Sequence, residues 1–201
     1  MLEFQRLVRF VVNAALNAEL EHIQWTKGRS ILDAGCEHLV STSVARAAAA
    51  FYGVNNDIRI RLECPVSELT AKRSSKGRVD CAIFKGDAPL VIIECKRGLY
   101  KGIITNDIKR CCEILRAIES LNKCAILIGL RLRHEEDKTD KNESALKIAK
   151  KLAEQSPKYS FEAFSQSREF DPPIEKHIHP TTGKELTWMA SLAQAILIQA
   201  T

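Results

Sequence analysis

The sequence predicts an α/β protein in which a mixed central sheet is flanked by helices. Apolar residues recur at helical spacing near the start of the chain, three strand-like segments follow one another closely between residues 58 and 95, and an apolar segment at 123–130 comes after another helical stretch. That intervening helix is long enough to cross over the sheet, so the strands on either side of it are expected to be parallel. The predicted order of elements is ααβββαβαβα.

The first two elements are predicted to be helices. Over residues 2–24, apolar side chains fall at intervals of three and four, which is the spacing of one helical face. The Ala-rich stretch 38–52 contains neither glycine nor proline, and Gly53 follows it as a stop signal. Glu37 lies at or near the first turn of this second helix.

Strands and a crossover helix are predicted to form the middle of the chain. Turns rich in Gly, Ser and Pro separate three strand-like segments, at 58–66, 78–84 and 90–95. Short links of this kind favour neighbouring strands joined as hairpins. Residues 105–120 return to helical spacing, and the nearly continuous apolar run 123–130 is typical of a central strand buried on both faces.

The C-terminal third is predicted to be a loop followed by helix, strand and helix. The polar run 131–142 carries both charge signs and is expected to be a solvated loop. A helix at 143–155 and a strand at 159–166 follow, and the Pro-containing connection 171–173 leads to a final helix at 185–200.

Length and composition indicate one domain with a real core. The chain has 201 residues, of which 45% are hydrophobic and 27% charged, and a chain of this size buries roughly 70% of its unfolded surface. We expect a single domain over 1–201, with a core at 37–130, an N-terminal helical extension at 1–36 and a C-terminal helix–strand–helix extension at 143–201. No apolar stretch approaches the ~18 uninterrupted residues of a membrane span, so no membrane association is expected.

Seven cysteines are present, and most of them lie inside apolar runs. An odd number without any Cys-x-x-Cys spacing favours reduced, buried thiols over disulfides or structural zinc. The interpretation that fits this pattern is a cytoplasmic protein.

Acidic residues and a lysine gather where the second and third predicted strands should meet. Asp80 lies in the second strand, and Glu94-Cys95-Lys96 ends the third, directly after four apolar residues. Side chains alternate along a strand, so Glu94 and Lys96 point to the same face. Burying an ionised carboxylate costs several kcal/mol unless it is paired or binds a metal. The alternative is a set of exposed strand-end ion pairs, Asp80 with Arg78 and Glu94 with Lys96, each contributing under ~1 kcal/mol.

Two carboxylates that converge from adjacent strands repel each other unless a cation lies between them. Mg²⁺ prefers oxygen ligands and commonly uses one or two carboxylates together with a phosphate, and Mn²⁺ is able to substitute for it. A lysine beside such a metal can hold an attacking water and the scissile phosphate, which is the equipment of metal-assisted phosphodiester hydrolysis.

In these residues the sequence resembles the PD-(D/E)xK nuclease superfamily, which has the restriction endonuclease-like fold. The resemblance covers roughly residues 37–130: Asp80, thirteen intervening positions and Glu94-Cys95-Lys96, on an αβββαβ order, with Val79 where the family name has proline. It implies that Asp80, Glu94 and the main-chain carbonyl of Cys95 bind Mg²⁺. It also implies that Lys96 positions the attacking water, and that the products carry 5′-phosphate and 3′-hydroxyl groups.

Family members often add an acid from the helix before the first strand. Glu37 matches that place best, so the resemblance makes it both a catalytic residue and a metal ligand. The rival acids are Glu19, Glu21 and Glu63. An acid in a first helical turn is also favoured simply by the helix dipole.

Basic residues flank the acidic pair on both sides and suit contacts with a phosphate backbone. The candidates for nucleic-acid binding are Lys72, Arg73, Lys76, Arg78, Arg97 and Lys101.

The sequence therefore predicts a Mg²⁺-dependent DNA nuclease of restriction, repair or mobile-element type. A two-fold homodimer would suit cleavage of both duplex strands. The alternative is a non-catalytic nucleic-acid-binding or assembly subunit that keeps the fold. A small enzyme of other chemistry ranks below both, because neither a phosphate-binding loop nor a Ser-His-Asp signature is found.

Overall fold

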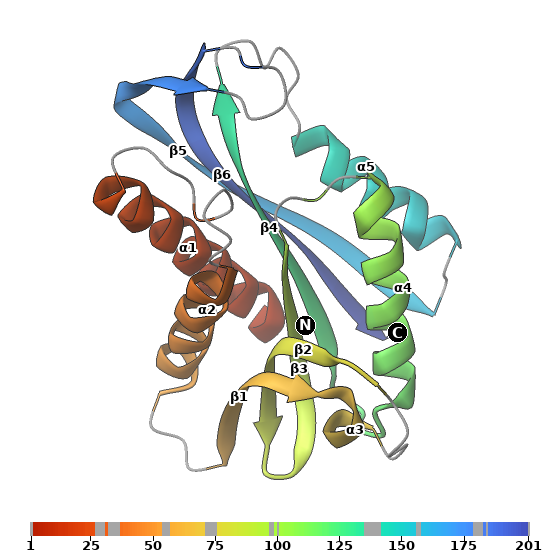
Figure 1. Cartoon of the computed structure of the whole chain (residues 1–201). Helices are drawn as coiled ribbons and strands as arrows, with labels where there is room; N and C mark the ends of the chain where they lie inside the picture. Colours follow the sequence, from red (N-terminus) through yellow and green to blue (C-terminus); the bar gives the residue numbers. More distant parts are fainter. Residues whose placement is uncertain are drawn as a thin grey trace.

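The computed structural model of the chain describes residues 2–26, 31, 37–53, 57–70, 76–96, 99, 101–134, 142–155, 158–178, 183 and 185–200. Across these residues, six strands form one sheet in the order β1-β2-β3-β4-β6-β5 (Figure 1). The strands are β1 (Ile58–Pro65), β2 (Arg78–Lys85), β3 (Ala88–Lys96), β4 (Cys124–His134), β5 (Tyr159–Ile178) and β6 (Glu185–Ala200).

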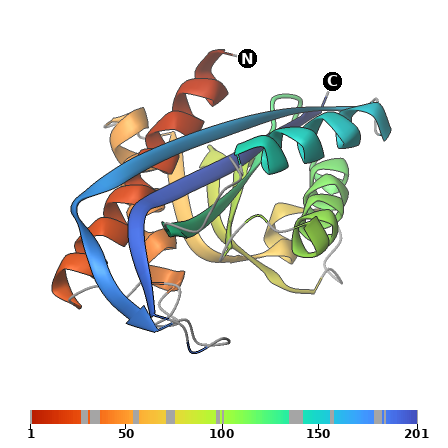
Figure 2. The same ribbon diagram turned by 90° about the horizontal axis from the view of Figure 1, so that it is seen from above.

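Helices cover both faces of this sheet, as the sequence predicts. On one face lie α1 (Leu2–Trp25) and α2 (Glu37–Tyr52), and on the other lie α4 (Lys101–Ala117) and α5 (Asn142–Gln155) (Figures 1 and 2). A single turn, α3 (Val66–Leu69), follows β1. Each pair of helices closes its own cluster of buried residues against the sheet, so the core has two layers separated by the strands.

The first four strands have the predicted pairings. β1, β2 and β3 are antiparallel neighbours; a tight turn joins β2 to β3, whereas α3 lies in the longer connection between β1 and β2. β3 and β4 are parallel, with Glu94 opposite Leu127 and Lys96 opposite Gly129, because α4 carries the chain back across the sheet between them. Residues 124–130 are all buried, which agrees with the prediction of a central strand.

The predicted C-terminal helix at 185–200 is wrong, because these residues form β6. This strand lies between β4 and β5 and is antiparallel to both. Every residue from Ala190 to Ile198 is buried. A strand buried on both faces has a continuous apolar run, and that pattern cannot be distinguished from a buried helix by periodicity. The Ala, Leu and Gln residues favour a helix locally, but pairing with two neighbours decides the outcome.

β5 is also longer than the predicted strand at 159–166. It continues to Ile178, so residues 171–173, predicted from the sequence to be a connection, are part of the strand. Its pairing with β6 is interrupted between Glu169 and Ile174, around the two consecutive prolines. Proline cannot donate a backbone hydrogen bond, so it is tolerated in an edge strand at such an irregularity.

Gly129 of β4 lies directly against Leu99, in the chain that follows β3. A Cβ atom at this position would lie 2.6 Å from Leu99 Cγ and 2.9 Å from the Leu99 backbone nitrogen. Gly129→Ala should therefore lower the free energy of unfolding by about 1–3 kcal/mol, as measured by urea denaturation. The added variant Leu99→Ala should recover part of the loss in a double-mutant cycle. If the losses of stability in the two single variants simply add in the double variant, the contact between Gly129 and Leu99 is not the cause of the destabilisation.

The cysteines behave as core residues in the part of the chain that the structure describes. Six of them are free thiols, and five of these six are buried. Burial raises the pKa of the Cys81 thiol to about 12, so it is protonated and unreactive at neutral pH. Cys36 lies outside the described residues. None of the described helices has both the length and the apolar character that crossing a membrane requires.

Candidate active site

Adjacent strands bring the predicted acids and lysine together. Asp80 lies in β2, and Glu94 and Lys96 end β3. Alternation along β3 places Glu94 on the face of Ile92, a residue of the cluster that packs beneath α4. The charge of Asp80 acts on Glu94, so the two carboxylates lie near each other at the end of β3.

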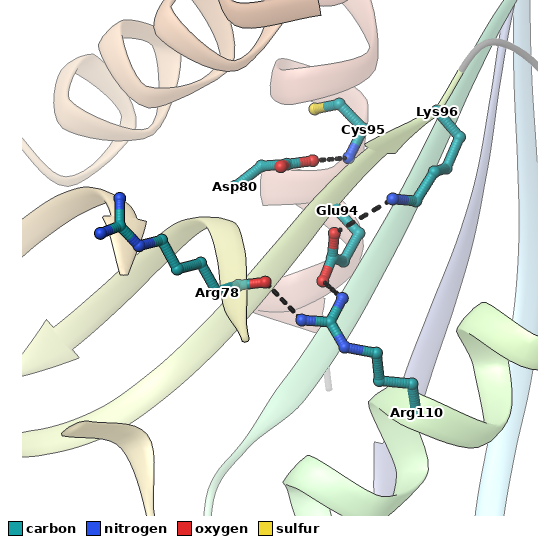
Figure 3. A network of polar contacts seen from close by, with 6 residues as sticks. All are labelled: Arg78, Asp80, Glu94, Cys95, Lys96 and Arg110. Carbon is teal, nitrogen blue, oxygen red and sulfur yellow. Dashed lines mark hydrogen bonds and ion pairs between the residues drawn. The ribbon is translucent and has the colours of Figure 1, made fainter. Parts of the chain in front are cut away.

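Three polar contacts define the arrangement (Figure 3). The Cys95 backbone N–H donates a hydrogen bond to Asp80 Oδ2 at 2.6 Å, which ties β2 to β3 between the two site residues of β3. Lys96 Nζ lies 3.4 Å from Glu94 Oε2. The other carboxylate oxygen of Glu94 accepts a hydrogen bond from Arg110 Nη1 of α4. Both oxygens of Glu94 therefore face a cation.

Glu94 is almost completely buried, with 2% of its surface exposed. Burial, followed by the nearby negative charge of Asp80, raises the pKa of Glu94 to about 7, although Arg110 and Lys96 both act to lower it. An exposed strand-end ion pair, the alternative left open by the sequence, is excluded for this residue. The location instead imposes a free-energy cost on an ionised carboxylate.

Lys96 keeps its charge at neutral pH. Burial alone would lower the pKa of Lys96, but the charges of Glu94, Asp107 and Asp80 outweigh it and raise that pKa above its usual value. Lys96 therefore enters the site as an ammonium that can donate hydrogen bonds.

Arg110 is a site residue that the sequence did not predict. Its guanidinium contacts Glu94 and also donates a hydrogen bond to the Arg78 carbonyl of β2. Asp107, whose charge acts on Lys96, lies three residues earlier, on the same side of α4. The only sequence signal for this role is that Asp107 and Arg110 are charged residues at i and i+3 of a crossover helix that begins near the end of β3. Such charges are normally assigned to the solvent face.

Glu37 takes no part in the contacts and charges described for Asp80, Glu94 and Lys96. It opens α2 with an exposed side chain, and no group of three or more His, Cys, Asp or Glu side chains able to hold a metal ion occurs among the described residues. Of the rival acids, Glu21 is exposed, whereas Glu19 is buried and its Oε2 accepts a hydrogen bond from the Ile31 backbone at 3.0 Å. That bond gives Glu19 a structural role.

Glu63 is the rival acid nearest to Asp80 in register. The ladder pairs Leu62 with Cys81 and Cys64 with Val79, which places Glu63 opposite Asp80. Its φ is 49°, in the left-handed region that a non-glycine residue rarely adopts. The side chain is exposed. Backbone strain of this kind costs about 1 kcal/mol or more and is concentrated at functional sites.

The predicted nucleic-acid-binding residues are only partly within the described chain. Lys76 and Arg78 are exposed at the start of β2, two to four residues from Asp80. Lys101 opens α4, but its side chain is not described. Lys72, Arg73 and Arg97 lie outside the described residues.

The donor set is compatible with a divalent cation. The carboxylates of Asp80 and Glu94, together with the Cys95 carbonyl, are hard oxygen ligands of the kind that Mg²⁺ uses. The pKa of Glu94 stays above its usual value even with Arg110 and Lys96 in place. The site therefore still favours additional positive charge.

Comparison with known proteins adds nothing to this description, since no protein-family model, curated protein or solved structure matches the chain. The functional interpretation depends on the chemistry of the chain's own residues.

Proposed function

We propose that the chain is a metal-dependent nuclease of the PD-(D/E)xK type that hydrolyses phosphodiester bonds in DNA. The observation that carries the proposal is the buried Glu94 carboxylate, which lies beside Asp80 and 3.4 Å from the Lys96 ammonium. A fold gains little stability from such a group, whereas a site that binds a cation and a phosphate requires it.

Asp80, Glu94 and the Cys95 carbonyl would hold Mg²⁺, which supplies positive charge to stabilise the developing charge on the phosphate. The hydrogen bond from the Cys95 N–H fixes the Asp80 carboxylate and the end of β3 relative to each other. Lys96 would orient the attacking water and contact the scissile phosphate, and its ammonium form suits both tasks. Exposed Lys76 and Arg78 would bind the DNA backbone, which makes affinity sensitive to salt.

Asp80→Asn tests the proposal with little disturbance of the fold, because an amide oxygen can still accept the hydrogen bond from Cys95. The parent chain should cut DNA when Mg²⁺ or Mn²⁺ is present and stop when EDTA is added, whereas Asp80→Asn should be at least about a hundredfold slower. Plasmid, linear, single-stranded and branched DNA should be assayed. If none of these DNA substrates is cut, the nuclease assignment is rejected.

A non-catalytic nucleic-acid-binding subunit is the second candidate. It is favoured by one observation, that Arg110 and Lys96 already contact both oxygens of Glu94 and reduce the need for another cation. This candidate predicts salt-dependent DNA binding that Asp80→Asn leaves unchanged, without cleavage.

A further inference from the structure

The guanidinium of Arg110 lies between the end of β3 and the start of β2. It contacts the Glu94 carboxylate at the end of β3 and the Arg78 carbonyl at the start of β2. A Cβ atom at Gly77 would lie 3.4 Å from Arg110 Nη2, which is an ordinary contact distance, so the guanidinium lies close to the chain that enters β2. Gly77 also has a φ of 95°, which other residues rarely adopt. The contact is therefore specific in geometry, with two different acceptors for one guanidinium (Figure 3).

The same contact lies on the group that the proposed function assigns to the metal. Arg110 neutralises Glu94 on one oxygen, while Lys96 faces the other at 3.4 Å. A divalent cation bound to the Glu94 carboxylate would meet the guanidinium charge directly, and like charges at contact distance repel each other. Arg110 and a divalent cation would therefore compete for the Glu94 carboxylate.

Arg110 is placed so that it can leave without unfolding the helix. Its side chain is 35% exposed, whereas that of Glu94 is 3% exposed. The buried residues Ile108, Cys111 and Leu115 hold α4 against the sheet independently of the guanidinium. Rotation of one long side chain is enough to release Glu94.

We propose that Arg110 is the internal counter-ion of the candidate site, which neutralises Glu94 when no divalent cation is bound and is displaced from it when one binds. This inference rests on the proposed function. It makes Arg110 a positioning residue, because it sets the metal affinity through Glu94. Linkage is reciprocal, so metal binding loosens the contact between Arg110 and Glu94 as much as that contact weakens metal binding.

Titration with Mn²⁺ by calorimetry, in the absence of DNA, tests the proposal. Arg110→Met removes the competing charge and should tighten Mn²⁺ binding about tenfold or more, equivalent to about 1.4 kcal/mol. Arg110→Lys keeps the charge and should remain near the parent. Arg116→Met is the matched control, since Arg116 is exposed on the same helix, and it should leave the affinity unchanged.

The outcomes separate the inference from the proposed function. Mn²⁺ affinity that is unchanged or weaker in Arg110→Met overturns the counter-ion role and leaves the nuclease proposal standing. If neither the parent nor any folded variant binds Mn²⁺, both proposals are lost. A purely structural role for Arg110 would lower the thermal stability of Arg110→Met without tightening metal binding. Circular dichroism confirms that each variant is folded before titration.

Discussion

Lys96→Met should abolish most cleavage, with a loss of about a hundredfold or more in the single-turnover rate at saturating DNA and Mg²⁺. Methionine has a similar length but carries no charge and no donor, so it cannot orient water or stabilise the phosphate. The ammonium of Lys96 is held 3.4 Å from Glu94 and keeps its charge because nearby acids raise its pKa. The measurement is the rate of product formation on a fluorescently labelled DNA.

Lys85→Met provides the matched control. Lys85 is an exposed lysine at the other end of β2 from Asp80, so the chemical change is the same and the site is distant. This control should cut at the parent rate. A Lys96→Met chain that cuts like the parent would show that the lysine has no catalytic role, even if cleavage itself depends on metal.

Glu94→Gln should make the chain more stable at pH 8 while removing its activity. The pKa of Glu94 in the folded chain is about 7, against its usual 4.5, because of burial and the charge of Asp80. Ionising this group in the folded state therefore costs up to about 3 kcal/mol at pH 8, and glutamine avoids that cost with nearly the same shape. For a chain of this length the expected rise in melting temperature is roughly 10 °C.

The sign of the pH dependence follows from linkage. Between about pH 4.5 and 7 the folded state holds a proton on Glu94 that the unfolded state has lost, so the parent loses stability as pH rises through this range. The advantage of Glu94→Gln should therefore be largest above pH 7 and nearly absent below pH 5. Urea denaturation of both chains in EDTA gives the two free energies. A Glu94→Gln chain that is less stable at pH 8 would mean that the ion pairs with Arg110 and Lys96 outweigh the burial.

Much of the first part of the fold could be predicted because local signals agree with tertiary structure there. β1, β2 and β3 pair in chain order, and the length of the helical segment after β3 requires a crossover, so the parallel pairing with β4 follows from chain geometry. β6 could not be predicted in this way. It consists of residues that favour a helix but are buried on both faces, and one of its two partners, β4, is separated from it in the sequence by α5 and β5.

The candidate site shows the same division between local and distant information. Asp80, Glu94 and Lys96 could be brought together from strand alternation and neighbouring strands alone. The role of Arg110 depends on how α4 is rotated over the sheet, and nothing in its own segment reports that rotation. The contrast between Glu37 and Glu94 is similar: both are acids at element ends, but only packing shows that Glu37 is exposed and Glu94 buried.

The position of β6 also has a consequence for how the chain folds during synthesis. β1 to β4 can pair as soon as they are made, but the outer edge of β4 stays open until β6, the last described strand, is available. β5 is made earlier, yet it joins the sheet only through β6. Until then an apolar strand edge is exposed, and such edges recruit other chains. Truncation before β6 should therefore convert a folded protein into one that aggregates, and closure of the sheet by a distant strand should be the slow step of folding.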